Sequence, residues 1–370
     1  MPSQNKYPVK IYVCEPDIGD LEVKHVTDAI KKTEISSIAP PVHRLESAFA
    51  EKFGMKHAVA VNSGGSALFL ALKALGIGPG DEVIVPDFTM IATAAAVSHC
   101  GATPVFVDSS EHSFNIDPAK IEEKITSRTK MIMPVHIYGE PCDMDAIMAI
   151  AKKHNLLVVE DAAEAHGAKY KDKLVGTFGH ANCFSFYANK IMTTGEGGMI
   201  VTNDDELAER LRHMRGYDFD DEKHFWHKTI AWNLRMSALG AALGLAQLKR
   251  LDELIEKRRA NAKYYMKGLA DVPGIRFFPE PPDTFCVFWM FGILVSRMDE
   301  LMDFLGRNGI ETRTFFIPMH AQPVYNQQGD FKWADHYGAN GLYLPSSSQL
   351  SDKDKDLVIA KIKEFYGVPV

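Results

Sequence analysis

Between residues 58 and about 160, short apolar runs alternate with stretches of helical spacing. The apolar runs are 58–62, 82–85, 103–108, 130–135 and 156–161, and the helical stretches are 67–75, 91–99, 118–125 and 143–154. This alternation is typical of right-handed βαβ units, in which parallel strands are joined by crossover helices. The sequence therefore predicts an α/β fold with a mostly parallel central sheet flanked by helices.

The C-terminal part has a different pattern. A long helix is predicted over 236–259, followed by helices over 262–269, 298–308 and 352–365 and by short strands over 286–295 and 310–314. A chain of 370 residues can divide into more than one domain. We predict a large domain over residues 1–250, N-terminal arm included, and a smaller α+β domain over 251–370.

One lysine lies in an unusual setting. Lys190 follows the apolar residues Phe184 and Phe186 and precedes the glycine-rich turn 195–198. Burial would lower the pKa of its amine and make it a nucleophile toward a carbonyl, as in a Schiff base. The alternative is that the lysine stem only covers apolar surface at the end of a strand.

A carboxylate at the end of a buried strand strengthens the first interpretation. The run 156–161 ends in Glu160 and Asp161. Ligands of open α/β sheets bind beyond the carboxyl ends of the strands, so Asp161 would point into that crevice. A lysine that binds an aldehyde and an aspartate that keeps a ring nitrogen protonated together suggest pyridoxal phosphate.

A glycine-rich turn between a strand and a helix is a candidate phosphate site. Residues 63–66 read Ser-Gly-Gly-Ser and open the predicted helix 67–75. The free backbone N–H groups at such a helix start, together with the helix dipole, stabilise a phosphate. The alternative is a tight turn capped by a serine.

Two further residues follow strands on the same side of the predicted sheet. Phe88 comes after the strand 82–85 and could stack on a cofactor ring, although a buried aromatic is also a common core residue. His136 follows the run 130–135 and could contact substrate or cofactor, or act as a structural hydrogen-bond donor. The aromatic, irregular stretch 215–233 is predicted to be a functional loop.

Charge and cysteine content exclude several classes of protein. The net charge is −7 and no basic face is evident, which argues against nucleic acid as a partner. The five cysteines are scattered, so we expect reduced thiols, a cytoplasmic location and no metal site. No apolar run is long enough to span a membrane and no export signal is evident, so no membrane partner is expected.

Taken in order, the motifs are similar to those of a known family. Over nearly its whole length the chain resembles the DegT/DnrJ/EryC1/StrS family of pyridoxal-phosphate-dependent nucleotide-sugar aminotransferases. The resemblance rests on residues 61–68, 81–86, 136–139, 160–165, 184–190, 194–198 and 233–236. It implies the type I, aspartate aminotransferase-like fold and a cofactor that alternates between pyridoxal and pyridoxamine 5′-phosphate.

The resemblance also implies a role for each matching residue. Lys190 would bind the cofactor aldehyde and move the proton, Asp161 would pair with the ring nitrogen, Glu164 would face the ring hydroxyl and Phe88 would cover the ring. The phosphate would be held by Gly64, Gly65, Ser66 and Ser185, and Asn233 would reach the phosphate of a neighbouring subunit. The family builds each site from two chains, so the resemblance implies at least a homodimer. Gly65 stands where relatives usually have threonine, and the loop 33–41 lacks the aromatic and glycine signature of many sugar-processing relatives.

The substrates are also implied by the resemblance. The stretch 187–198 is most similar to that of the GDP-perosamine synthase branch, which acts in O-antigen and lipopolysaccharide synthesis. We therefore expect transfer of an amino group from L-glutamate to C4 of GDP-4-keto-6-deoxy-D-mannose. The candidates for the sugar and diphosphate pocket are His136, Arg215, Trp226, Arg313 and His320.

Three alternatives stay open at this point. The first is a 3- or 4-aminotransferase that acts on a UDP- or dTDP-linked keto-sugar. The second is a sugar dehydratase of the same family, although such enzymes replace the lysine by histidine. The third is a non-catalytic sensor that binds the cofactor, although the chain has no basic helical extension for DNA binding.

Overall fold

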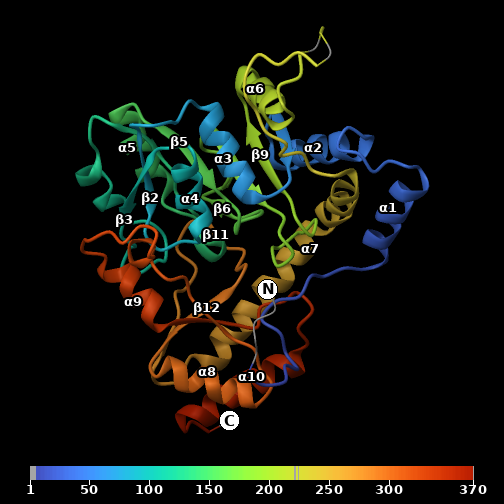
Figure 1. Cartoon of the computed structure of the whole chain (residues 1–370). Coiled ribbons are helices and arrows are strands. Elements are labelled where there is room, and N and C mark those ends of the chain that lie inside the picture. Colours follow the sequence, from blue (N-terminus) through green and yellow to red (C-terminus); the bar gives the residue numbers. More distant parts are fainter. Residues whose placement is uncertain (1–5, 221, 224, 370) are drawn as a thin grey trace.

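The computed structural model describes residues 6–220, 222–223 and 225–369. The chain forms a large sheet with helices on both faces, drawn in the upper part of Figure 1, and a smaller group of strands and helices below it. One long helix, α7 (Ala238–Leu269), runs from the first part into the second.

The large sheet has seven strands and only one of them runs against the others. The strand order is β1 (His57–Val61), β9 (Gly198–Thr202), β8 (Ala181–Ser185), β5 (Leu157–Asp161), β4 (Thr129–Ile132), β2 (Glu82–Pro86) and β3 (Thr103–Val107). Strand β9 is antiparallel to both of its neighbours, and the other pairings are parallel. The predicted α/β fold with a mostly parallel sheet is confirmed.

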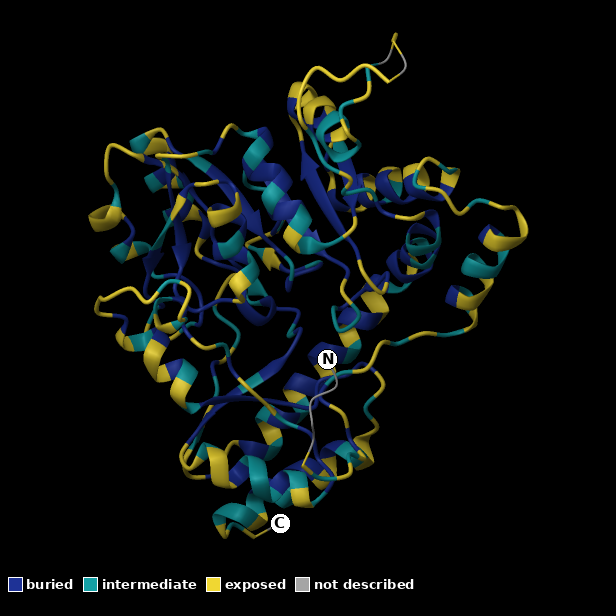
Figure 2. Ribbon diagram, viewed as in Figure 1, coloured by how far each residue is buried: buried dark blue, intermediate teal, exposed yellow. Residues whose placement is uncertain are grey.

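Both faces of this sheet are buried, which explains why its strands are continuous apolar runs. On β2, Val83 and Val85 belong to the larger apolar core and the intervening Ile84 belongs to a separate cluster on the other face. The larger core contains residues of α2 (Pro40–Phe53), α3 (Gly64–Ala74), α4 (Ile91–His99) and α6 (Asp205–Arg215). The second cluster contains residues of α5 (Met144–His154). Figure 2 shows the strands of the sheet as buried and the outer loops as exposed.

The C-terminal part contains a four-stranded antiparallel sheet. Its strand order is β10 (Ile275–Arg276), β12 (Phe291–Val295), β14 (Gly341–Leu344) and β13 (Arg313–Thr314). Helices α8 (Met298–Arg307) and α10 (Asp352–Tyr366) and the end of α7 pack on it. This agrees with the predicted α+β character. The boundary at 250/251 stays a prediction, because α7 crosses it without a break.

Three local predictions are wrong. The stretches 236–259 and 262–269 form the single helix α7, because no proline or glycine lies between them and Asn261 is held by Ser347 and Lys355. The stretch 118–125 forms two 3₁₀ turns, Pro118–Lys120 and Glu122–Lys124, because its N–H groups bond carbonyls three residues back, as from Ile121 to Pro118 and from Ile125 to Glu122.

The third wrong prediction is the strand 286–295. Only β12 is a strand there, and Phe288 has a positive φ of 47° that interrupts the extended chain. The preceding pair β11 (Thr284–Phe285) joins a separate small sheet with β6 (Lys169–Tyr170) and β7 (Lys173–Leu174).

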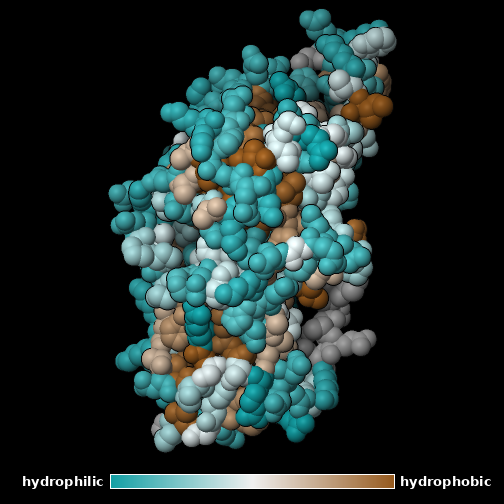
Figure 3. All heavy atoms as spheres, turned by 90° about the vertical axis from the view of Figure 1, so that its left-hand side faces the viewer, coloured by the Kyte–Doolittle hydropathy of each residue, from teal (hydrophilic) through white to brown (hydrophobic). Residues whose placement is uncertain are grey.

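The remaining elements lie outside these sheets. Helix α1 (Asp20–Lys31) packs against α7, and α9 (Lys332–Asn340) packs against β12 and β14. In the part of the chain that the structure describes, no helix is both long and apolar enough to cross a membrane. Figure 3 shows that the face on the left of Figure 1 is mostly hydrophilic, with small hydrophobic areas between the polar side chains.

Candidate active site

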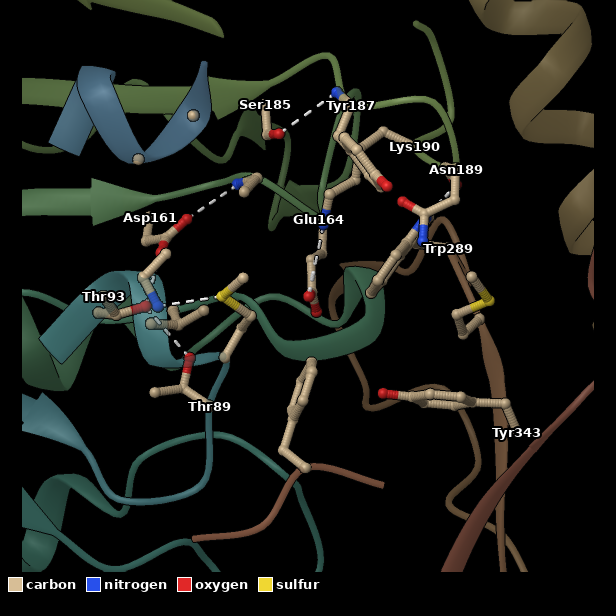
Figure 4. Close-up of a pocket in the computed structure, with 18 of the residues that line it drawn as sticks. Thr89, Thr93, Asp161, Glu164, Ser185, Tyr187, Asn189, Lys190, Trp289 and Tyr343 are labelled. Carbon is tan, nitrogen blue, oxygen red and sulfur yellow. Dashed lines mark hydrogen bonds and ion pairs between the residues drawn. The ribbon is translucent and has the colours of Figure 1, made fainter. Parts of the chain in front are cut away.

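A cavity of about 560 Å³ lies where the carboxyl ends of the large sheet meet the C-terminal part of the chain. Its floor comes from β5, β8 and the start of α3, and its other wall comes from residues after position 288 (Figure 4). The lining residues are Gly64, Gly65, Leu68, Thr89, Met90, Ala92, Thr93, Val135, Asp161, Ala163, Glu164, Ser185, Tyr187, Asn189, Lys190, Trp289, Met290, Met302, Arg313, Thr314, Phe316 and Tyr343. This is the crevice that the parallel strands predict.

Lys190 reaches into this cavity from the turn that follows β8. Its Nζ lies 3.6 Å from Oε1 of Glu164 and 3.7 Å from the ring centroid of Trp289. Its side chain is only 11% exposed, and burial lowers the pKa of the amine against the opposing pull of Glu164 and Asp161. A buried amine with a lowered pKa is suited to attack a carbonyl.

Asp161 ends β5 and faces the same cavity. Its Oδ2 accepts a hydrogen bond of 2.8 Å from the Thr93 hydroxyl, and its Oδ1 accepts one of 3.1 Å from the Ala163 N–H. Burial raises the pKa of this carboxyl, against the opposing effects of the Thr93 and Ala163 hydrogen bonds and of the nearby Lys190. Among the described residues, no cation forms an ion pair with it. The site is therefore suited to receive a cationic partner such as a protonated ring nitrogen.

Glu164 lies between these two residues on the turn after β5. Its Oε2 accepts the backbone N–H of Tyr138 at 2.8 Å, while its Oε1 faces Lys190. Burial raises the pKa of Glu164 and the nearby Lys190 opposes that rise. The structure thus brings Lys190, Asp161 and Glu164 together, as the sequence predicts.

The start of α3 has both a serine cap and backbone N–H groups that face the cavity, the two alternatives that the sequence left open. Ser63 caps the helix, since its Oγ accepts the Ser66 N–H at 3.1 Å and donates to the Ser66 hydroxyl at 2.9 Å. Gly64 and Gly65 line the cavity, and among the described residues their N–H groups have no hydrogen-bond acceptor. A Cβ on Gly64 would lie 2.6 Å from Cβ of Ser185, so a larger residue cannot fit there. Ser66 itself is held in the cap rather than in the lining.

The structure corrects the placement of Phe88. Its side chain is fully buried among Phe114, Phe315 and Tyr337, with ring centroids about 6 Å apart, and it does not line the cavity. The turn after β2 directs Phe88 into the core and leaves Thr89 and Met90 at the cavity wall. Met90, which is exposed, lies at the cavity wall where the ring of Phe88 was expected.

His136 is also outside the cavity lining. Its Nε2 donates to Glu160 Oε2 at 3.0 Å, and its Nδ1 accepts the Cys142 N–H at 3.0 Å. Glu160 also accepts the N–H groups of residues 176 and 179. Successive strand residues point to opposite faces, so Asp161 faces the cavity and Glu160 faces His136. The arrangement corrects the substrate role and supports the structural alternative.

Of the other candidates for the sugar pocket, only Arg313 lines the cavity. Arg215 bonds Glu46 at 2.5 Å and the Ala60 carbonyl at 2.8 Å, and thereby fastens the end of α6 to β1 and α2. His320 bonds Asp87 at 2.6 Å. Both are therefore structural in this chain, which corrects their assignment to its own pocket.

Trp226 and Asn233 lie on the excursion 216–233, away from the cavity of their own chain. Both are exposed, and Trp226 contacts Lys223, whose Nζ lies 3.7 Å from the indole centroid. Within the described residues, two isolated bridges, Gly216 to Asn233 and Phe219 to His227, make the excursion hairpin-like. The predicted irregular loop is thus partly paired.

Sequence reasoning missed several residues of the site. Thr93 could have been found, because a hydroxyl in the first turn of a helix after β2 faces the same edge as Asp161. Asn189, Trp289 and Tyr343 carried no recognisable signal, because the last two come from a part of the chain that folds back over the cavity.

Comparison with known proteins places this geometry among enzymes that transfer amino groups. A model of the DegT/DnrJ/EryC1/StrS aminotransferase family matches residues 16–363. The GDP-perosamine synthase of Caulobacter vibrioides is 46% identical over 363 residues, which cover 96% of this chain and 98% of that protein. The GDP-perosamine synthase of Escherichia coli O157:H7 is 42% identical over 361 residues, covering 96% and 99%. The solved structure of Streptomyces venezuelae DesV has a TM-score of 0.91 at 37% identity and covers 99% of this chain and 100% of that chain. The predicted aminotransferase fold is confirmed.

Proposed function

The chain belongs to the DegT/DnrJ/EryC1/StrS aminotransferase family, and from this membership we propose that it converts GDP-4-keto-6-deoxy-D-mannose to GDP-perosamine with L-glutamate as amino donor. The observation that carries the proposal is the buried amine of Lys190 beside two carboxylates, in a chain 46% identical to a GDP-perosamine synthase. The amino group goes to C4 of the sugar, and glutamate leaves as 2-oxoglutarate.

The enzyme is an aminotransferase that uses pyridoxal 5′-phosphate. The residues present fit this cofactor. Lys190 supplies the amine for its aldehyde, and Asp161 is a buried carboxylate that forms no ion pair among the described residues. The N–H groups of Gly64 and Gly65, which have no acceptor within the described part of the chain, lie beside Ser185 and suit a phosphate. We propose that these residues hold the cofactor and that Glu164 faces its ring hydroxyl. When bound, the cofactor withdraws electrons from the bonds of the amino-acid Cα.

The side chains around the cavity have separate roles in the proposed reaction. Lys190 Nζ takes the proton from Cα of glutamate in the first half-reaction and returns a proton to C4 of the sugar in the second. Asp161, held by Thr93, stabilises positive charge at the ring nitrogen. Arg313 is the one arginine among the described lining residues, and although it pairs with Glu311 at 3.1 Å its side chain is 45% exposed. It is therefore placed to bind an anionic group of the substrate.

A panel of keto-sugars tests the substrate. The enzyme is first converted with L-glutamate to its pyridoxamine form, and return of the aldehyde absorbance is then followed after adding GDP-, UDP- or dTDP-linked 4-keto-6-deoxy sugars. We expect kcat/KM for the GDP sugar to exceed the others by at least about tenfold. Equal turnover of all three would contradict the assignment, and Lys190→Ala serves as the inactive control.

We further propose a homodimer whose active sites are shared between the subunits. The excursion 216–233 exposes Phe225 (73%), Trp226 (51%) and Ile230 (93%), an unusual number of large apolar side chains for a solvated loop. Asn233 lies on the same excursion, outside its own cavity. A second copy that covers this loop would bury the apolar side chains. Asn233 and Trp226 of the first chain would then lie at the cavity of the second chain.

Mixed dimers test the sharing. Lys190→Ala lacks the amine and Asn233→Ala lacks the proposed contact to the neighbour's phosphate, so each homodimer should be impaired. A mixed dimer has one site with Lys190 from one chain and Asn233 from the other. We expect activity to return on mixing, to about a quarter of the wild-type value if chains exchange freely. No recovery in verified mixed dimers would contradict shared sites, and a monomer in light scattering would contradict the dimer.

We also propose that the enzyme works in the cytoplasm. All five cysteines are free thiols, which fits a reducing compartment. Cell fractionation with detection of the native chain tests this, and recovery in an exported fraction would contradict it.

A further inference from the structure

Trp289 connects the C-terminal part of the chain to the reactive lysine. It lies between β11 and β12 and is only 5% exposed. Its Nε1–H donates a hydrogen bond of 2.7 Å to the carbonyl of Asn189, the residue before Lys190. The face of the same indole lies 3.7 Å from Nζ of Lys190 (Figure 4). One side chain therefore contacts both the backbone and the amine of this segment.

The indole is itself held in place. The guanidinium of Arg258, on the buried side of α7, donates to the Trp289 carbonyl at 2.6 Å and to the Ser346 carbonyl at 3.2 Å. The thiol of Cys14 donates to the same Asn189 carbonyl at 3.3 Å. Cys14 and Trp289 thus hold the lysine segment directly, and Arg258 of α7 holds both of them, since it also donates to the Cys14 sulfur at 3.4 Å.

Within the part of the chain that the structure describes, few groups lie close enough to Lys190 to stabilise its charge. Glu164 lies at 3.6 Å, beyond ordinary hydrogen-bond distance, and its other oxygen is engaged by the Tyr138 N–H. The indole face is the other close contact, and a desolvated ammonium gains most from such a face. The remaining titratable or charged groups around the lysine and the cavity are Asp161, His166, Cys14, Arg258, Arg313, Tyr187 and Tyr343.

We propose that Trp289 is a positioning residue for the amine: its ring stabilises the ammonium form of Lys190 and its N–H fixes the peptide that carries this lysine. The kinetic part of the inference rests on the aminotransferase function, whereas the effect on the amine is a property of the chain alone. A residue that only filled space would leave the titration of Lys190 unchanged.

Two substitutions separate the ring from the N–H. Trp289→Leu removes both, and Trp289→Phe keeps an aromatic face without the donor. Cofactor-free protein is labelled by reductive methylation between pH 6 and 10, and labelling of Lys190 is followed by mass spectrometry. We expect the pKa of Lys190 to fall by about one unit in the leucine variant and by about half as much in the phenylalanine variant. A wild-type pKa in the leucine variant overturns the effect of the ring.

The half-reaction with L-glutamate measures positioning. We expect kcat to fall about tenfold in Trp289→Leu and about threefold in Trp289→Phe, with KM for glutamate changed less than about twofold. An unchanged kcat in both variants overturns the positioning role. If the leucine variant fails to fold by circular dichroism, the phenylalanine variant decides, and wild-type values of both pKa and kcat overturn the proposal.

Trp333→Phe is the matched control. Trp333 also carries a lysine on its ring, with Lys332 Nζ 4.4 Å from the centroid, but it lies on α9 away from the cavity lining. We expect it to leave the titration of Lys190 and kcat unchanged. Because the titration uses neither cofactor nor sugar, a lowered pKa in Trp289→Leu would support the role of Trp289 even if no GDP sugar were turned over.

Discussion

Aspartates lie at the carboxyl ends of three strands of the large sheet, and they have two different roles. Asp87 and Asp108, at the ends of β2 and β3, accept backbone N–H groups of the C-terminal part, from His320 to Asp87 and from Trp333 and Ala334 to Asp108. Asp161, at the end of β5, faces the cavity, and the hydrogen-bond partners of its side chain within the described residues are Thr93 and Ala163 of the large sheet region.

The difference between them is set by what lies opposite. The chain from residue 319 to 334 covers the ends of β2 and β3. Asp87 there accepts an N–H of the 3₁₀ turn Met319–Ala321, and Asp108 accepts N–H groups at the start of α9. Over β5 the C-terminal part stands back and leaves the cavity. A strand-end carboxylate thus hydrogen-bonds the segment that covers it, or, where no segment covers it, faces the cavity and can bind a ligand there.

The largest expected effect is on activity, at Asp161. Asp161→Asn keeps the shape of the side chain but removes the negative charge, so we expect kcat/KM for transamination to fall about 10²–10³-fold. Its unfolding free energy should not fall, because burial disfavours the charged form of this carboxyl. Steady-state kinetics and urea unfolding measure the two. Activity within a factor of three of wild type would contradict a catalytic role for the charge.

Asp108→Asn should show the opposite pattern. The side chain of Asp108 is buried, caps α9 and pairs with Lys120 at 2.8 Å. Loss of the charge should lower the unfolding free energy by about 2 kcal/mol. Urea unfolding measures this loss, and kcat should stay near that of the wild type. If the Asp108 variant lost activity and kept its stability, the comparison between the two ends of the sheet would be wrong.

Thr93 is expected to have an intermediate effect, because it acts on catalysis through Asp161. Thr93→Val keeps the shape and removes the hydroxyl that donates to Asp161 at 2.8 Å. We expect kcat to fall about tenfold, close to the free energy of one hydrogen bond to a charged group. Combining it with Asp161→Asn in a double-mutant cycle measures the coupling. Additive effects would show that Thr93 does not act through Asp161.

The sequence predicted the parts of this site that depend on local pattern. Continuous apolar runs predicted buried parallel strands, and the strand ends predicted where Asp161 and Lys190 would meet. It could not decide between neighbouring side chains, because whether Phe88 or Met90 faces the cavity depends on the direction of the turn after β2. It also could not decide between the two roles left open for His136, because this depends on which face of β5 carries Glu160 and which carries Asp161.

Contacts between distant parts of the chain could also not be predicted from the sequence. Trp289 and Tyr343 reach the cavity only because the C-terminal sheet folds back over it. Arg215 is a residue type that often binds anionic substrates, yet here its guanidinium donates to Glu46 and to the Ala60 carbonyl. Which partner a charged side chain finds is decided by packing between elements, and neither spacing nor periodicity carries that information.

Glu140 gives the smallest effect and tests the comparison at a fourth carboxylate. It follows the 3₁₀ turn Ile137–Gly139 and, among the described residues, no cation pairs with it. Its Oε1 accepts the Ser113 hydroxyl at 2.5 Å. Burial raises the pKa of Glu140 to about 7. Between pH 4.5 and 7 the folded chain therefore keeps a proton that the unfolded chain has lost, so this residue's contribution to stability falls as pH rises through that window.

Glu140→Gln cannot ionise. We expect its unfolding free energy relative to wild type to increase by about 1 kcal/mol from pH 5 to pH 8, less than the full shift because the side chain is only partly buried. Urea unfolding at four pH values measures the trend, with the exposed Glu111→Gln as control for the loss of one charge. A difference that stays constant with pH would show that Glu140 is ionised in the fold and, like Asp108, already stabilised by its neighbours.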